Sequence, residues 1–201
     1  RRGVLVEDLL ELVLANVRTP EIRRADLLAQ AAANDVGAER LRALALRHGI
    51  SFLRDAFDEV IAYAERRTRD VLRSLPDGTF EADGEIEGDG VSDVDIPIRV
   101  AVTIDGDTMR VDFAGTSGPV AGNVNCPVSV TQSACLFALR VLLPADVPIN
   151  AGSAAPLELV VPRPSLVDAR RPAAVVAGNV ETSQRLADTV LAALGRAVRD
   201  D

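Results

Sequence analysis

The spacing of apolar residues changes abruptly at Pro76-Asp77-Gly78, and this change is the strongest constraint on the fold. Before this turn, apolar residues recur every three to four positions, which is typical of amphipathic helices. After it, apolar and polar residues alternate, which is typical of strands with one solvated face. A run of helices followed by hairpin-connected strands indicates the α+β class. We therefore predict an α+β fold with a helical scaffold segment over residues 1–75 and an α+β segment over residues 76–201.

The first segment predicts three helices. A short amphipathic helix is expected over Val4–Asn16, and Thr19-Pro20 marks the start of a second helix with Thr19 as its N-cap. The second helix could run to Arg47 and is closed by His48-Gly49, and a third is expected over Ile50–Leu75. Because only a short turn separates the two long helices, we predict that they pack as an antiparallel helical hairpin.

The second segment opens with an acidic strand and a hairpin. From Glu81 to Asp89 every odd-numbered residue is Asp or Glu, so this strand, expected over Phe80–Asp89, should have one solvated face. A calcium site is the alternative, but the spacing does not match an EF-hand loop. A strand over Ile96–Ile104 should turn at Asp105-Gly106-Asp107 and return over Thr108–Phe113, because Asp-Gly between alternating runs favours a hairpin.

The remainder predicts a mixed layer of strands and buried helices. The helix expected over Ser129–Leu143 is apolar nearly all round, which is typical of a buried helix. Leu157–Val161 should be a strand, and Ala173–Ala177 a short strand that is buried on both faces. A last helix should follow the polar run that ends at Gln184 and should extend to about Val198.

The charge distribution excludes several classes of partner. The net charge is −8, and residues 76–112 hold 11 acidic residues against 2 arginines, so the whole excess lies in one block. Without a basic patch, nucleic-acid binding is not expected. No apolar run is long enough for a membrane span, and two cysteines are too few for a disulfide framework. We therefore expect a cytoplasmic protein with free thiols.

A loop over Asp112–Pro127 is rich in Gly, Pro, Asn and Ser/Thr residues. Such residues are typical of binding loops, although they could also serve only to satisfy backbone groups. Within the loop, Val120–Val124 reads Val-Ala-Gly-Asn-Val, and the same five residues recur at Val176–Val180. Each copy precedes a predicted helix, where free N–H groups suit a carboxylate or phosphate. Alternatively, Asn179 or Thr182 simply caps its helix.

Two further chemistries would depend on single residues. Cys126 precedes a predicted helix, where thiolates are favoured, but it lacks an evident base. The only histidine, His48, ends a scaffold helix, so neither a Cys/His pair nor a His-based metal site within this chain is expected. The first residues, Arg1–Asp8, contain no initiator Met and no signal-like apolar core, which leads us to expect an internal fragment of a longer subunit.

Segments spread over nearly the whole chain resemble the hydantoinase B/oxoprolinase family, and they occur in the family's order. They are Leu14–Pro20 (LANVRTP), Leu75–Thr79 (LPDGT), Val111–Ser117 (VDFAGTS), Asn125–Pro127 (NCP), Pro148–Gly152 (PINAG) and Ala177–Arg185 (AGNVETSQR). The last segment is the most distinctive. The resemblance implies an internal part of the B subunit of an ATP-dependent cyclic amidase, which opens rings such as hydantoin or oxoproline. Two alternatives stay open, namely a subunit of an ATP-dependent ketone carboxylase of the acetone or acetophenone type and a non-catalytic assembly module.

The resemblance also implies partners and cofactors. Members pair with a hydantoinase A-type subunit that handles ATP, and the divalent metal of the family is expected from residues outside this sequence. We therefore expect this chain to bind no cofactor itself, to be inactive alone and to act within an oligomer.

Candidate site residues come from the polar crowding around the last helix and from the glycine-rich loop. Four polar side chains fill one turn at the start of that helix, whereas a cap needs one. Glu181 is the candidate catalytic residue, which would position substrate or water. The candidate substrate-binding residues are Asn179, Thr182, Ser183, Gln184, Asp112, Ser117, Asn123 and Asn125. No metal ligand is assigned.

Overall fold

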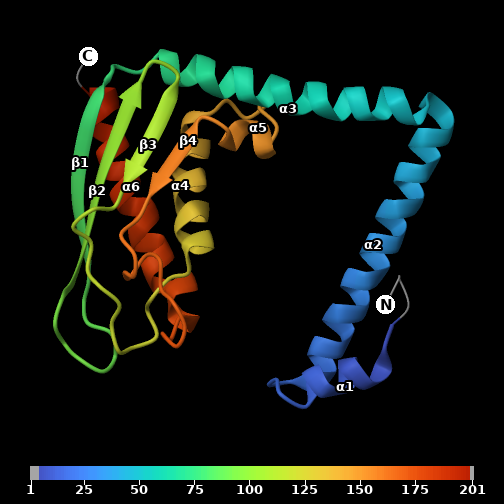
Figure 1. The fold of residues 1–201 in the computed structure, drawn as a ribbon, viewed down its shortest axis with the longest axis horizontal. Coiled ribbons are helices and arrows are strands. Elements are labelled where there is room, and N and C mark those ends of the chain that lie inside the picture. The colour runs from blue at the N-terminus through green and yellow to red at the C-terminus, as the bar shows by residue number, and fades with distance from the viewer. Residues whose placement is uncertain (1–4, 200–201) are drawn as a thin grey trace. The chain divides into compact units, whose positions relative to one another are not determined.

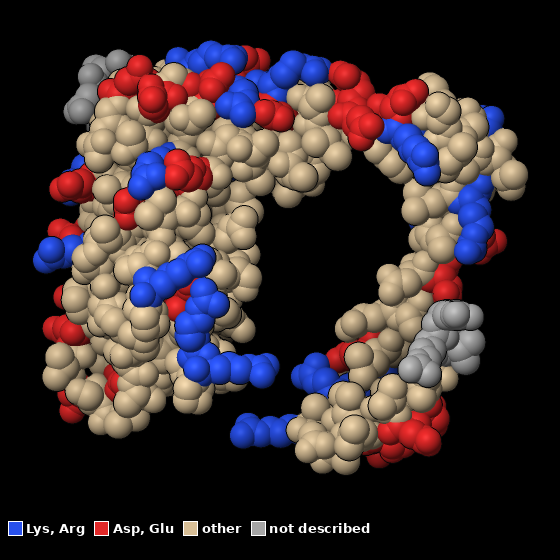
Figure 2. All heavy atoms as spheres, in the orientation of Figure 1, with Lys and Arg blue, Asp and Glu red and all other residues tan. Residues whose placement is uncertain are grey.

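The computed structural model describes residues 5–199, in which six α-helices, one 3-10 helix and a four-stranded sheet form an α+β fold (Figure 1). The predicted fold class is therefore confirmed. The chain divides into two compact units, residues 1–58 and residues 59–201, so that helix α3 (Ile50–Arg73) contributes to both. Along α3, acidic and basic side chains are interspersed on the face seen in Figure 2. No helix within residues 5–199 is long and apolar enough to cross a membrane.

The first unit contains α1 (Glu7–Leu14), α2 (Pro20–His48) and the beginning of α3. Arg24 of α2 pairs with Glu7 at 2.7 Å and also with Glu11, which ties α2 to α1. The predicted boundaries hold to within a few residues, although Val4 lies outside the described residues. Thr19 precedes α2 as predicted, but its side chain makes no capping hydrogen bond.

The predicted packing of the two long helices is not found. Only Gly49 separates α2 from α3, with a positive φ of 87°. A reversal between helices needs a connection of about 2–5 residues, so one glycine does not turn the chain back on itself. Within the described chain, none of the 29 residues of α2 is buried, whereas a packed hairpin would bury its apolar stripe.

The second unit is built on a sheet with the strand order β1-β2-β3-β4. Strands β1 (Gly78–Ile86), β2 (Ile96–Asp105) and β3 (Thr108–Asp112) are antiparallel, as the hairpin signals predicted. Strand β4 (Leu157–Val160) pairs in parallel with β3, because the chain between them crosses over through α4 (Val128–Leu142) and α5 (Ala151–Ala154).

Helix α6 (Glu181–Arg199) covers one face of the sheet, where it packs on β1, β2 and α4 (Figure 1). The acidic side chains of β1 point to the other, solvated face, as predicted. Gly84 allows close approach of α6, since a Cβ there would lie 2.4 Å from Oγ1 of Thr189. The buried core is mainly aliphatic and includes Ile98, Val102, Ile104, Val111, Phe113, Leu139, Leu186, Val190 and Leu194.

Three predicted elements differ from the structure. Strand β1 ends at Ile86 and not at Asp89, because Gly88 and Gly90 adopt positive φ and turn the chain. Helix α4 is buried on one side only, since Phe137 and Val141 are exposed. Residues 173–177 form no strand.

The segment predicted as that strand forms turns because its backbone groups find partners elsewhere. The Ala173 N–H donates to the Arg170 carbonyl and the Ala177 N–H to the Asn123 carbonyl, both at 2.9 Å. Val176–Asn179 then form the 3-10 helix η1, with Val176 exposed.

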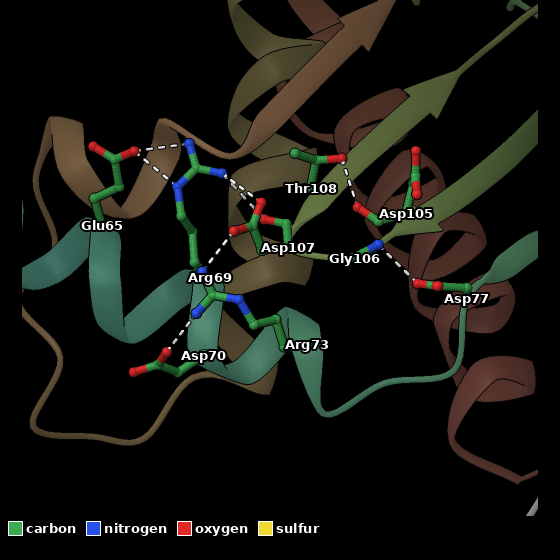
Figure 3. Close-up of polar contacts among 9 residues, drawn as sticks. All are labelled: Glu65, Arg69, Asp70, Arg73, Asp77, Asp105, Gly106, Asp107 and Thr108. Carbon is green, nitrogen blue, oxygen red and sulfur yellow. Dashed lines mark hydrogen bonds and ion pairs between the residues drawn. The ribbon is translucent and has the colours of Figure 1, made fainter.

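The C-terminal half of α3 is fixed to the sheet by the turn between β2 and β3 (Figure 3). The Asp107 carboxylate pairs with Arg69 at 2.9 Å and with Arg73 at 2.6 Å. The Asp77 carboxylate accepts the Gly106 N–H at 2.8 Å, which joins the start of β1 to the same turn. These contacts hold the second unit together at the end of the sheet where β1 begins.

Candidate functional site

A pocket of about 410 Å³ opens in the second unit between the end of β1, the glycine-rich loop and the junction of η1 with α6. It brings together two of the predicted site residues, Glu181 and Asn123. The lining residues are Ile86, Glu87, Gly88, Asp89, Gly90, Asn123, Val124, Ala177, Glu181 and Arg185. An adjacent pocket of about 490 Å³ lies along β1 and α6, and Glu87 and Arg185 line both pockets.

Asp89 joins two of the loops around the pocket. Its Oδ1 accepts the N–H groups of Val91 (2.9 Å) and Ser92 (2.7 Å), and its Oδ2 accepts the N–H of Gly122 (2.7 Å). These donors stabilise the carboxylate and hold the pKa of Asp89 below its ordinary value, with the Gly122 hydrogen bond as the largest cause. The period-two pattern predicted a solvated Asp89, but the residue is buried.

The two Val-Ala-Gly-Asn-Val segments lie against each other. The carbonyl of Asn123 accepts the N–H groups of Ala177 (2.9 Å) and Gly178 (3.2 Å). Both glycines are needed for this approach, because a Cβ on Gly122 would lie 1.9 Å from the Asp89 carbonyl oxygen and one on Gly178 would lie 2.1 Å from that of Asn125. The carboxylate bound by the first copy is thus the chain's own Asp89.

Asn125 and Thr182 are buried next to the pocket, and their polar groups are bound within the protein. The Asn125 amide donates to the carbonyls of Val120, Gly122 and Ala174 at 2.9–3.0 Å, and its Oδ1 accepts the Val120 N–H at 2.8 Å. The Thr182 hydroxyl donates to the Val124 carbonyl. Both side chains therefore fix the loop that carries Asn123.

The other candidates near α6 are Asn179, Ser183 and Gln184. Ser183 Oγ donates to the Asn179 carbonyl at 2.8 Å across the first turn of the helix. Asn179 and Gln184 are exposed, and none of the three lines the pocket in the described structure. They lie beside Glu181 in sequence but outside the group of residues that meets in the pocket.

Asp112 and Ser117 lie in the loop after β3. The Asp112 carboxylate accepts the Ala114 N–H at 2.9 Å and pairs with Arg110 at 3.3 Å. Ser117 bridges two segments through its backbone, since its N–H donates to the Pro97 carbonyl and its carbonyl accepts the Leu166 N–H, both at 3.0 Å. Neither residue lines the pocket described above.

Three residues of the pocket were absent from the predicted set, namely Glu87, Asp89 and Arg185. Arg185 follows Glu181 by one helical turn, a spacing that places both side chains on the same face of a helix and is visible in the sequence. Glu87 continues the acidic alternation of β1 past the end of the strand. The role of Asp89 depends on a contact with Gly122, 33 residues away in sequence, and no local pattern predicts it.

The side chains of this pocket can act in two ways. A carboxylate such as that of Glu181 or Glu87 can orient a water molecule and accept its proton. The guanidinium of Arg185 can donate paired hydrogen bonds to an oxyanion. Ile86, Val124 and Ala177 add apolar wall, so the pocket suits a small molecule with both polar and hydrocarbon parts.

The cysteines do not add a nucleophile. The Cys126 thiol is buried and donates to the Gly178 carbonyl at 3.1 Å, and burial raises its pKa to about 11. Burial likewise raises the pKa of Cys135 to about 12. Within residues 5–199, no group of three or more His, Cys, Asp or Glu side chains is arranged to hold a metal ion. The described residues therefore do not fit a metal centre of their own.

Known proteins resemble this chain in sequence. A profile of the hydantoinase B/oxoprolinase family matches residues 1–201. The chain is 36% identical to 5-oxoprolinase 1 of Arabidopsis thaliana, over 84% of this chain and 14% of that protein. It is 31% identical to the B subunit of a D-/L-hydantoinase, so named for Pseudomonas sp. (strain NS671), over 98% of this chain and 35% of that protein.

Two solved structures share the fold. An ATP-dependent caprolactamase from Pseudomonas jessenii matches with a TM-score of 0.87 and 28% identity, over 96% of this chain and 34% of that one. A nucleotide-free acetone carboxylase matches with a TM-score of 0.80 and 18% identity, over 96% and 27%, which supports the fold alone. The chain thus spans about a third or less of each of these proteins. The resemblance predicted from six short segments is confirmed, and the chain belongs to the hydantoinase B/oxoprolinase family.

Proposed function

We propose that this chain is part of the B subunit of an ATP-dependent cyclic amidase and that its pocket forms part of the wall where the ring is opened. The observation that carries the proposal is the meeting of Glu181, Asn123 and Arg185 in one pocket, in a chain of this family. Relatives named as an oxoprolinase and as part of a hydantoinase support a cyclic amide as the substrate class.

The chemistry of ring opening suits these side chains. Hydrolysis of an amide needs a positioned water and donors for the oxygen on which negative charge develops. Glu181 orients the water and takes its proton, Arg185 donates to the developing oxyanion, and the Asn123 amide orients the ring. The proposal assigns ATP to a hydantoinase A-type partner and the divalent metal to residues outside this chain.

The test uses the full-length subunit together with its A-type partner. ATP consumption is followed with oxoproline, hydantoin or acetone, each with and without bicarbonate. Turnover of a cyclic amide without bicarbonate is expected, and Glu181→Gln should lower kcat by about 100-fold or more. Glu81→Gln, on the solvated face of β1, is the matched control and should leave kcat unchanged. Turnover only with acetone and bicarbonate would replace this proposal with a ketone carboxylase.

A second role, in assembly, is favoured by the first unit. Helices α1 and α2 expose many large apolar side chains, which are Leu9, Leu12, Val13, Ile22, Leu27, Leu28, Val36, Leu41, Leu44 and Leu46. Exposed apolar surface of this extent is typical of protein–protein contact. We propose that this unit contributes to binding of the A-type partner. The double variant Leu27→Gln/Leu28→Gln should weaken the complex in light scattering, whereas Arg42→Gln should not, and equal complex formation by both would exclude the role.

A further inference from the structure

We propose that Asp89 is a positioning residue for this pocket, which holds the loop carrying Asn123 against η1 and thereby sets the place of Glu181. The inference rests on the proposed function of the pocket. Asp89 itself lines the pocket, but its carboxylate is turned into the protein, where both oxygens are hydrogen-bonded.

The hydrogen bonds of Asp89 have two different purposes. Those from Val91 and Ser92 close the loop that follows β1 and are local, as in many Asp-initiated turns. The bond from Gly122 is long-range and ties this loop to the glycine-rich loop. Since a Cβ on Gly122 would lie 1.9 Å from the Asp89 carbonyl oxygen, the two backbones are in direct contact at this point.

The contact continues from the glycine-rich loop to α6. Asn123 follows Gly122, and its carbonyl accepts the N–H groups of Ala177 and Gly178 in η1. The Val180 N–H donates to the Ala177 carbonyl at 3.0 Å, and Glu181 is the next residue and the first of α6. Two backbone links therefore connect the Asp89 carboxylate with the start of the helix that carries Glu181.

The site requires a carboxylate. An ionised Asp offers acceptors only, and here three N–H groups point at its two oxygens. An Asn of the same size would turn its own NH2 group toward at least one of these donors and would lose that hydrogen bond. Asp89→Asn is therefore a near-isosteric way to loosen the junction of the two loops.

Asp168 provides a matched control. It is also a buried carboxylate of the second unit, paired with Arg163 at 2.8 Å and with Arg170 at 3.2 Å, and it lines neither of the pockets described above. Asp168→Asn thus removes a buried charge without touching the proposed links. A general loss of stability would affect both variants, whereas a positioning role is specific to Asp89.

The experiment compares both variants in the full-length subunit with its A-type partner. Hydrogen exchange is measured for residues 118–126 and 174–182, and kcat and KM are measured for ring opening below the unfolding transition. Asp89→Asn should speed exchange in both segments and lower kcat by about 10- to 100-fold. Asp168→Asn should leave exchange in these segments and kcat unchanged. Adding Asp89→Asn to Glu181→Gln should cause little further loss, because the two act through the same group.

The outcomes separate the two proposals. Faster exchange confined to residues 87–95 with unchanged kcat would mean that Asp89 only closes its own loop, and the inference would be overturned. Additive losses in the double variant would also overturn it. If the wild-type complex opens no cyclic amide, the proposed function fails, while the exchange data still decide whether Asp89 holds the two loops around Glu181.

Discussion

Replacing Gly178 with Ala tests the contact between the two repeated segments most directly. The new Cβ would lie 2.1 Å from the Asn125 carbonyl oxygen, 2.8 Å from its carbonyl carbon and 3.1 Å from Sγ of Cys126. The first two are backbone atoms, so no side-chain rotation relieves the clash. Gly178 does not have a positive φ, and the substitution therefore measures the contact and not backbone strain.

The expected cost follows from the displacement. Bringing the Cβ to about 3 Å from the carbonyl oxygen needs a shift of about 1 Å, in a region where Asn125 and Cys126 are fully buried. Overpacking of this kind costs about 1–3 kcal/mol, and weakening one or two hydrogen bonds adds about 1 kcal/mol. A total of about 3 kcal/mol should lower the Tm of a chain this size by about 6–12 °C.

The assay is thermal and urea unfolding of the purified protein, followed by circular dichroism. Gly195→Ala is the matched control, because Gly195 lies in α6 and a Cβ added there would have nothing within 4 Å. It should stabilise the protein by about 0.5–1 kcal/mol through helix propensity. A Gly178→Ala variant within about 0.5 kcal/mol of the wild type would refute the close packing of the two segments.

Three further predictions concern charge and protonation. Asp107→Asn should cost about 0.5–1 kcal/mol in urea unfolding, because its partly exposed ion pairs with Arg69 and Arg73 are lost, and the difference should shrink in 0.5 M salt, on the order of a Debye length of 5 Å or less. Since burial raises the pKa of Cys126 from 9.0 to about 11, its thiol stays protonated in the folded state after the unfolded one ionises. Stability should then fall as pH rises through that interval, and a thiol reagent at pH 8 should react far faster after unfolding. The lowered pKa of Asp89 contributes stability above the ordinary value of 3.8, which is lost as pH falls through the folded pKa, so Asp89→Asn should flatten acid unfolding there.

The elements of the fold could be predicted where the signal is local. The hairpin at Asp105-Gly106-Asp107, the helix start at Pro20 and the solvated face of β1 all follow from spacing within a few residues, and the structure confirms them. The strand predicted over Ala173–Ala177 was wrong because a short apolar run does not specify its partner. Its backbone groups bind Arg170 and Asn123, and neither contact can be deduced from the run itself.

The candidate site could be predicted in part for the same reason. Polar crowding at the start of α6 indicated Glu181, and the repeat indicated Asn123, and both line one pocket. Asn125 has the same composition signal as Asn123, two residues away, yet its amide is bound inside the loop. Which of two neighbouring asparagines faces a pocket depends on long-range contacts, such as that of Asp89 with Gly122, that spacing alone does not specify.

The repeated segment shows how one short sequence can serve two purposes in a single site. In the first copy, the Gly122 N–H is bound by Asp89, and in the second copy the N–H groups of Ala177 and Gly178 are bound by the carbonyl of Asn123. These backbone donors therefore hold loops together and are not free to receive an anionic ligand. The task of contacting a substrate passes to side chains, chiefly to Glu181 and Arg185 on consecutive turns of α6. Loops rich in glycine and asparagine thus provide position, and a regular helix presents the reactive groups, which is the arrangement that gives a small polar site its rigidity.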